Sequence, residues 1–513
     1  EVGGMANLLS AHRDLANPAH RAEVAKLWGV PDVPAQPGKT AVEMFQAAAD
    51  GEIKALWIVC TNPAQSLPDQ TTVKRALQRA EFVVLQEAFE GTATARFAHL
   101  LLPASSWGEK EGTVTNSERR ISRVRAAVPP PGQARDDWAI AVDFAQRLEA
   151  RLHPGRPTLF PYDGPEAVWN EHRESTRGRD LDITGLSWQR LDEAPQCWPC
   201  PEGASTGTGR LYADGRFPTP DSRARFADVP FKPVAEPRDA RFPFALNTGR
   251  LRDHWHGMSR TGTLGRLFGH MPEPALDLNP QDLARLRLAD GDLARVASRR
   301  GALVLPVRAS DTVSPAQAFV AMHWGDEHVL GGVNRLTSPA VCPQSHQPEL
   351  KHAAVRIEAA DLPWRLVALG WCDEPGALAL RRELRGFFER FTFSACVPFG
   401  RDRHGVLFRA AAAEPADAET VARIAGLFGL QGTQALHYSD ARRGQRRSLR
   451  LQSMAGDEQR LEAFLLAGDT RAESWIAPLL QGELPAQSFG RLMLAPGAAP
   501  PMAGAVRSRQ VCS

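Results

Sequence analysis

The chain has 513 residues, a length that predicts roughly three or four domains. Its formal charge of +2 gives no electrostatic reason to expect a nucleic-acid partner. The sequence has no run of about 18 apolar residues, so no membrane span is expected. The 40 prolines and 42 glycines predict many turns and connecting arms. The seven cysteines are odd in number and scattered, which argues against a disulfide framework and favours a reducing compartment.

The first predicted unit is an α/β layer. Residues 40–50 have the spacing of a helix, and Thr72–Arg79 predicts a second one. Three short apolar runs predict buried parallel strands, at Ala55–Cys60, Phe82–Leu85 and His99–Pro103. Strands and helices that alternate at this spacing predict a Rossmann-like layer, with helices packed over a parallel sheet.

Polar residues follow each of these predicted strands. They are Cys60–Pro63, then Gln86 and Glu87, then the string Trp107–Arg120. Ligands of parallel sheets bind at the carboxyl ends of the strands, where loops and helix N-termini gather. These ends therefore form a predicted site, although the pattern alone does not name its ligand.

The rest of the chain changes character twice. Residues 129–240 are proline-rich and predict connecting arms, with one helix near Trp138–Arg151. Residues 241–358 predict a small β-barrel, because short apolar stretches alternate with turns; the stretches are Phe242–Leu246, Leu293–Ser298, Ala302–Val307, Ala318–Met322 and Ala353–Ile357. Residues 361–500 predict an α+β segment, with helices near Pro375–Phe391 and Glu419–Gly429.

The string Trp107–Arg120 places a lysine, two arginines and several hydroxyl and amide side chains around a glycine. Such a loop offers many donors to phosphate and ribose oxygens. The plainer interpretation, a solvated charged surface loop, is favoured on chemistry alone, because loops of this composition are common.

A second string, Thr248–Gly262, combines three arginines, two histidines and a tryptophan. The arginines could pair with a pyrophosphate, and the aromatic rings could stack on a heterocycle. His254 and His256 would share one face of a strand, so a metal pair is conceivable, but no third ligand is evident nearby. A packed tryptophan with ordinary histidine neighbours is equally consistent with these residues.

Other motifs are weak. Cys197 and Cys200 have the spacing of a metal knuckle or redox pair, but they lack a second pair and only His172 lies near, so a structural role is favoured. No serine- or cysteine-centred nucleophile motif is present. Gly249, Gly257 and Gly262 do not form the fingerprint of nicotinamide binding.

Taken together, the strings resemble the large, catalytic subunit of assimilatory nitrate reductases, in the molybdopterin oxidoreductase family. Trp107–Arg120 resembles the signature of that family's third domain, and Thr248–Arg250 with His254–His256 resembles the opening of its dinucleotide-binding barrel. The assimilatory branch is indicated by three further strings: Gly3–Leu9 with His12–Asp14, Gln196–Pro201, and Gln347–Lys351. The resemblance covers residues 1–358 in order, and it favours the functional interpretation of both loops.

The resemblance implies a molybdenum–bis(molybdopterin guanine dinucleotide) cofactor and a set of residues that contact it. One dinucleotide would be contacted from the strand ends by Asn62, Gln86, Glu87, Lys110 and Asp137. The barrel would cradle pterin and pyrophosphate with Thr248, Gly249, Arg250, His254, Trp255, His256 and Gly257, and would complete its side with Trp324, Asn334 and Lys351. The implied division is residues 1–150 for part of the α/β domain, 151–240 for arms, 241–360 for a six-stranded barrel and 361–506 for an α+β extension.

Two departures from the family pattern bear on activity. The cysteines of the family's [4Fe–4S] cluster and its molybdenum-ligating cysteine lie in an N-terminal half absent from this sequence, so no catalytic residue is assigned. Residues 507–513 resemble the start of an appended [2Fe–2S] domain, in which Cys512 would be a ligand. We expect the sequence to be part of a longer protein, because both of its ends look truncated. We also expect these 513 residues alone to be inactive.

The implied activity is cytoplasmic reduction of nitrate to nitrite for nitrogen assimilation. Electrons would come from an NADH-linked reductase subunit, ferredoxin or flavodoxin. Two alternatives stay open: a formate dehydrogenase of the same superfamily, and a non-catalytic cofactor-binding or electron-transfer module.

Overall fold

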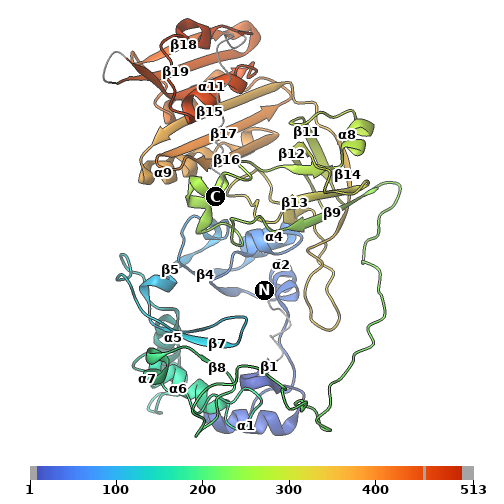
Figure 1. Cartoon of the computed structure of the whole chain (residues 1–513), viewed down its shortest axis with the longest axis vertical. Helices are drawn as coiled ribbons and strands as arrows, with labels where there is room; N and C mark the ends of the chain where they lie inside the picture. The colour runs from blue at the N-terminus through green and yellow to red at the C-terminus, as the bar shows by residue number, and fades with distance from the viewer. Residues whose placement is uncertain (1–7, 455–457, 499–513) are drawn as a thin grey trace.

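A computed structural model describes residues 8–454 and 458–498. Residues 3–7 of the amino-terminal string, and residues 507–513 with Cys512, lie outside the described part. The chain forms an elongated molecule of stacked regions, with the C-terminal sheet at one end and the helices of the arm region at the other (Figure 1). The α/β unit and the barrel lie between them.

The α/β unit contains the predicted parallel sheet. Its strands pair in the order β3-β4-β5, all parallel. A capping box at Thr40 starts its first helix, which ends at Gly51 in the left-handed conformation. The elements are α2 (Ala41–Asp50), β3 (Ala55–Val59), α3 (Pro63–Ser66), α4 (Gln70–Arg79), β4 (Phe82–Glu87) and β5 (Leu100–Pro103).

The expectation that these strands are buried is wrong for one face of the sheet. Residues of α2 and α4 pack with Leu56, Ile58, Val83 and Leu85 in one core. On the opposite face Trp57, Phe82 and Leu100 remain 38%, 46% and 43% exposed. Among the described residues only part of this face is covered, where the ring of Phe144 meets Trp57 at 4.9 Å.

The arm region is more regular than predicted. The expected helix is present as α5 (Asp137–Leu152), but two more, α6 (Pro165–Ser175) and α7 (Trp188–Glu193), occur where irregular arms were predicted. The string Trp107–Arg120 forms most of a hairpin, in which β6 (Gly112–Thr115) pairs with β7 (Arg120–Val124). Strand β7 also pairs with β8 (Gln196–Cys197) on its other side. At the amino-terminal end lie β1 (Leu8–Leu9), β2 (Arg13–Asp14) and α1 (Pro18–Trp28).

A long connection then leads from this region to the barrel. Residues 198–243 contain no helix or strand, and much of the segment runs as an extended line along one side of the molecule (Figure 1). Phe226 and Phe231 on it are 98% and 91% exposed. The segment is therefore a connection that packs few of its own side chains.

The predicted six-stranded barrel is confirmed. Its strands close in the order β10-β12-β11-β14-β9-β13, with parallel and antiparallel pairs mixed. The sequence missed the short β10, which completes the ring between β12 and β13. The elements are β9 (Phe244–Gly249), β10 (Leu276–Leu278), α8 (Pro280–Leu286), β11 (Leu293–Ala297), β12 (Ala302–Ala309), β13 (Gln317–Ala321) and β14 (Ala353–Ala359).

The α+β extension is confirmed as a six-stranded antiparallel sheet in the order β16-β17-β15-β20-β19-β18. Helices α9 and α10 cover one face of it. The predicted helix Pro375–Phe391 ends earlier, at Arg385 before Gly386. The elements are β15 (Trp364–Cys372), α9 (Glu374–Arg385), β16 (Phe393–Phe399), β17 (His404–Ala412), α10 (Ala418–Leu427), β18 (Ala435–Asp440), β19 (Gln445–Ser453), β20 (Gln459–Gly468) and α11 (Glu473–Gln481).

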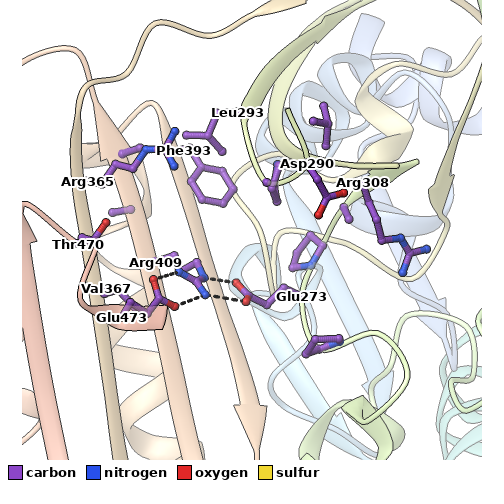
Figure 2. Close-up of a pocket in the computed structure, with 18 of the residues that line it drawn as sticks. Glu273, Asp290, Leu293, Arg308, Arg365, Val367, Phe393, Arg409, Thr470 and Glu473 are labelled. Carbon is purple, nitrogen blue, oxygen red and sulfur yellow. Dashed lines mark hydrogen bonds and ion pairs between the residues drawn. The ribbon is translucent and has the colours of Figure 1, made fainter. Parts of the chain in front are cut away.

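The other face of this sheet shares a core with the barrel and α11. Arg409 on β17 bridges the two regions, because its guanidinium donates to Glu273 at 2.9 Å and to Glu473 at 2.6 Å (Figure 2). Burial opposes the charge of Arg409, but the two carboxylates hold its pKa above its ordinary value. A cavity of about 410 Å³ lies beside this ion triad, between the barrel and the sheet.

Candidate functional site

The carboxyl ends of the parallel strands meet at Asp137. Its Oδ1 accepts from Gln86 Nε2 at 2.8 Å and from Cys60 Sγ at 3.2 Å, and its Oδ2 accepts from Lys110 Nζ at 2.6 Å. Asp137 begins α5, while Gln86 lies in β4 and Cys60 follows β3. Three of the predicted site residues, Gln86, Lys110 and Asp137, are therefore in direct contact.

Electrostatics at this cluster favour an ionised Asp137. Burial acts to raise the pKa of its carboxyl, but the bonds from Lys110 and Gln86 outweigh burial and lower it. Burial, followed by the neighbouring Asp137, raises the pKa of Cys60 to about 12. The Cys60 thiol consequently stays protonated and serves as a donor.

The predicted phosphate loop contributes less to this edge than its composition suggests. Its turn is closed from within, since Asn116 Oδ1 accepts from the backbone of Glu118 at 2.9 Å and Arg120 at 3.0 Å. Arg119 donates to backbone oxygens of the arm region, including Gly209 O at 2.9 Å. Lys110 is the residue of this string that the structure brings to Asp137.

Asn62 points to the seam between the sheet and the barrel. Its Nδ2 donates to Glu327 Oε1 at 2.8 Å, and its Oδ1 accepts from Thr94 Oγ1 at 2.7 Å. Gln65, one turn later, donates to the backbone oxygen of His323 at 2.9 Å. Asn62 therefore ties the end of β3 to the barrel, apart from the Asp137 cluster.

The barrel loop after β9 is held by a buried histidine. The backbone N–H of Leu251 donates to His323 Nε2 at 2.9 Å, so the proton of this ring lies on Nδ1, which donates to His256 O at 2.5 Å. Burial lowers the pKa of His323, in agreement with a neutral ring. Thr248 fixes the other side of the loop by donating to Leu350 O at 2.7 Å.

His254 lies inside this loop and is only 6% exposed. Its Nδ1 contacts Thr261 Oγ1 at 3.2 Å, while Nε2 is buried without a hydrogen-bond partner in the described part of the chain. Burial, followed by the neighbouring His323, lowers the pKa of His254 to about 4. His254 and His256 lie in a loop rather than a strand, and the described residues contain no group of three or more potential ligands placed for a metal.

The remaining predicted residues lie in different surroundings. Arg250 stacks 5.6 Å from the ring of the half-exposed Trp255. Trp324 is buried in the barrel core, and Asn334 donates to Gln65 O at 2.7 Å under α3. Lys351 is exposed, with Nζ 3.9 Å from Met322 Sδ.

One cavity is lined by a single predicted residue from each of the two groups. It has a volume of about 510 Å³ and is lined by Glu87 at the end of β4 and by Gly257 of the barrel loop. Glu327, His328 and Arg381 also line it, and all three are buried. Each has one buried side-chain atom without a partner among the described residues, namely Glu327 Oε2, His328 Nδ1 and Arg381 Nε.

These three residues were not identified from the sequence. Glu327 and His328 follow a buried tryptophan in a loop, and no periodic signal marks them. Arg381 did carry a signal, because Arg381 and Arg385 are four residues apart on a predicted helix and so share a face. Nothing in the sequence shows, however, that this face meets the barrel.

Two segments of the chain match models of known protein families. Residues 2–147 match the family model described as molybdopterin oxidoreductase, and residues 244–354 match the molydopterin dinucleotide binding domain. A nitrate reductase of Klebsiella oxytoca is 40% identical over 379 residues, which are 71% of this chain and 42% of that protein. The assimilatory nitrate reductase catalytic subunit of Bacillus subtilis is 37% identical over 361 residues, 70% of this chain and 49% of that protein.

A formate dehydrogenase is also among the relatives. The F420-dependent formate dehydrogenase subunit alpha of Methanocaldococcus jannaschii is 36% identical over 321 residues, 63% of this chain and 45% of that protein. The chain thus spans about half the length of the curated relatives that it matches. From the two matched segments and these relatives, the chain belongs to the molybdopterin oxidoreductase family.

Proposed function

We propose that the chain is part of a molybdenum enzyme that reduces nitrate to nitrite for nitrogen assimilation. In this proposal, these residues bind the molybdenum–bis(molybdopterin guanine dinucleotide) cofactor. The observation that carries the proposal is the shared cavity, where the end of β4 meets the barrel loop of a dinucleotide-binding segment. Relatives named as nitrate reductases support the choice of substrate.

The residues of the two predicted groups fit a large, anionic, hydrogen-bonding group. At Gly257 a Cβ atom would lie 2.0 Å from Gln65 Oε1, so any side chain there would require Gln65 to move from its place between the barrel loop and the α/β unit. The buried His254 Nε2 is left for a partner that the described residues do not supply. Lys110 and Gln86 add donors at the strand ends.

The roles of these residues follow from their charge and position. Asp137, ionised and held by Lys110, would accept from the N–H edge of a guanine. Gln86 would lie beside it, and Asn62 and Glu87 would contact the same dinucleotide from neighbouring strand ends. On the barrel side Thr248, Gly249, Arg250, Trp255, His256 and Gly257 would hold pterin and pyrophosphate, together with Trp324, Asn334 and Lys351. When bound, the cofactor supplies two-electron oxygen-atom transfer, and this chain binds and orients it.

The activity would also need parts that lie elsewhere in the longer protein. We assign the [4Fe–4S] cluster and the metal-ligating residue to the length of the relatives that this chain does not span, and a [2Fe–2S] cluster to a domain beginning near Cys512. An NADH-linked reductase subunit, ferredoxin or flavodoxin would supply electrons in the cytoplasm. The described residues include no helix long and apolar enough to cross a bilayer.

The test compares the longer protein, purified from its source, with the 513-residue chain. The longer protein should contain molybdenum and guanine nucleotide and should form nitrite from nitrate with reduced methyl viologen. The 513-residue chain should form none under the same conditions. Nitrite production by the short chain would contradict the assignment of the metal ligand to the missing length.

The relative from Methanocaldococcus jannaschii favours formate oxidation as the second candidate. The same preparation separates the two functions, since a formate dehydrogenase would reduce a dye with formate and leave nitrate unchanged. A preparation that holds cofactor but turns over neither substrate would instead favour a non-catalytic binding or electron-transfer module.

A further inference from the structure

Helix α9 brings the C-terminal extension to the cavity described above. Arg381, Arg382 and Arg385 line this cavity together with Glu87 and the barrel loop. All three arginines lie outside the segments that match the two family models, which end at residues 147 and 354. The cavity therefore has a cationic wall that neither family segment supplies.

Arg381 is a buried cation without an ion-pair partner among the described residues. It is 8% exposed, and its guanidinium donates to Gly262 O at 2.7 Å and to His328 Nε2 at 3.0 Å. No carboxylate among the described residues forms an ion pair with it, and its Nε–H has no acceptor there. A buried charge without a counterion is costly, so this arrangement indicates a place for an anion.

His328 points to the same kind of ligand. Because Arg381 can only donate, His328 Nε2 accepts and the ring proton lies on Nδ1. This Nδ1–H is buried without a partner in the described residues. Two residues that line the cavity thus each carry a buried donor without a partner in the described residues, Arg381 Nε–H and His328 Nδ1–H.

Arg385 adds a second cation one helical turn further along α9. Its Nη1 donates to Gly91 O at 3.0 Å, and no carboxylate in the described part of the chain forms an ion pair with it. Arg382, by contrast, is neutralised by Glu90. The i, i+4 spacing places Arg381 and Arg385 on the same face of the helix.

The carboxyl groups of the cavity do not cancel these charges. Glu327 Oε1 is occupied by Asn62 and by the backbone N–H of Ala93 at 2.6 Å, and burial raises the pKa of Glu327. Glu87 accepts from its own loop, at 2.8 Å from Ala88 N, and burial raises its pKa as well. Both carboxyls are therefore pushed toward the neutral form. Burial also lowers the pKa of Arg381 and Arg385, but a guanidinium starts from so high a pKa that both stay charged.

We propose that this cavity binds a phosphoryl group and that Arg381 and Arg385 of α9 are its cationic partners. The planar guanidinium matches phosphate oxygens in geometry as well as in charge. The phosphate could belong to the proposed guanine dinucleotide or be free in solution. The inference rests on the proposed function only in the first case, where the dinucleotide carries the phosphate. The C-terminal extension would then be part of the binding site.

The test is isothermal titration calorimetry of the 513-residue chain with pyrophosphate, inorganic phosphate and GDP at constant ionic strength. Arg385→Gln should weaken binding of pyrophosphate about tenfold, the loss expected for one charge-assisted hydrogen bond. Arg381→Gln should weaken it at least as much, and Arg385→Gln carries the test if the more buried Arg381 variant fails to fold. Arg401→Gln removes the same charge from an exposed loop of the same region and should leave binding unchanged.

The pattern across the probes identifies the carrier. If GDP and pyrophosphate both bind and both weaken in Arg385→Gln, the phosphate is nucleotide-borne. If pyrophosphate or phosphate behaves in this way and GDP does not bind, the site is for free phosphate, and its link to the dinucleotide is lost. Absence of binding by all three probes, or equal binding by Arg385→Gln and Arg401→Gln, would overturn the proposal. The proposed function is judged separately, by the cofactor content of the longer protein.

Discussion

The two main sheets of the molecule are covered to different degrees. The C-terminal sheet buries one face under α9 and α10 and the other against α11 and the barrel. The parallel sheet β3-β4-β5 buries one face under α2 and α4, but exposes large apolar side chains on the other. Parallel sheets are usually covered on both faces. The C-terminal sheet is therefore covered on both faces, whereas one face of the parallel sheet stays largely open among the described residues.

The covered sheet contributes to the stability of the barrel, whereas the open sheet carries strand ends of the candidate site. The covered sheet holds the barrel through a shared core and the Arg409 triad. The open sheet carries the polar strand ends. Under the proposed function its cover comes from the length of the relatives that this chain does not span.

The largest expected effect contrasts two phenylalanines. Phe408→Ala, in the covered sheet at 0% exposure, should lower the free energy of unfolding by about 4 kcal/mol, because it leaves a cavity in the core. Phe82→Ala, on the open face at 46% exposure, should cost under about 1 kcal/mol. Urea denaturation measures both, and similar costs at the two positions would show that the parallel sheet is not open.

The next effect concerns the junction between the barrel and the covered sheet. Arg409→Met should cost about 2 kcal/mol, because it leaves Glu273 and Glu473 facing each other while mostly buried. Adding Glu273→Gln and Glu473→Gln to this variant should restore most of the loss in thermal unfolding. A triple variant no more stable than Arg409→Met would mean that packing of the arginine, rather than charge, secures the junction.

Two neighbouring carboxyls at the seam between the open sheet and the barrel should respond oppositely to pH. Burial raises the pKa of Glu327 above its ordinary 4.5, so its contribution to stability is present below pH 4.5 and is lost as pH rises through the folded pKa. For Asp326 burial is outweighed, chiefly by Lys74, which lowers the pKa below 3.8. Its contribution is present above pH 3.8 and is lost as pH falls through the folded pKa.

Matched variants test this pair. Glu327→Gln should gain stability over the wild type as pH rises above 4.5, and Asp326→Asn should lose stability at neutral pH and recover toward the wild type in acid. Each difference should be on the order of 1 kcal/mol. Denaturation midpoints from pH 3 to 8, about the usual accessible range, measure it. Slopes of the same sign would contradict the assignment.

The smallest effect on folding is expected at the strand ends. Lys110→Gln should lower stability by less than about 1 kcal/mol, since Lys110 and Asp137 are both about one-third exposed. Under the proposed function, the same change should reduce the guanine nucleotide retained by the longer protein. A large loss of stability with unchanged nucleotide content would assign this pair to folding instead.

The sequence predicts those parts of the fold that have a local signal. The parallel strands and most of the barrel strands appear as short apolar runs. The three-residue β10 has no such signal, since its pairing with β12 and β13 is tertiary. The exposure of Trp57 and Phe82 was also unpredictable, because an apolar strand has the same sequence whether or not another layer covers it.

The candidate site likewise contains some residues that a local sequence signal predicts and others that only the tertiary packing brings together. Gln86, Lys110 and Asp137 follow from strand ends and from the family resemblance, and the structure joins them by hydrogen bonds. Glu327 and Arg381 belong to a loop and a helix that come together only when the barrel packs against the C-terminal sheet. No spacing in the sequence encodes that packing, so the cationic wall could be found only in three dimensions.

Residues 198–243 form an extended connection, so the two parts of the molecule that it joins should behave almost like two separate chains held together by a tether. A protease that cut near Phe226 would not separate the halves at once, because Asn62–Glu327 and the ion pair of Lys74 with Asp326 still join the α/β unit to the barrel. What the cut would remove is effective concentration, which such a tether keeps at roughly millimolar. The nicked protein would then obey mass action and come apart on dilution, whereas the uncut chain would not.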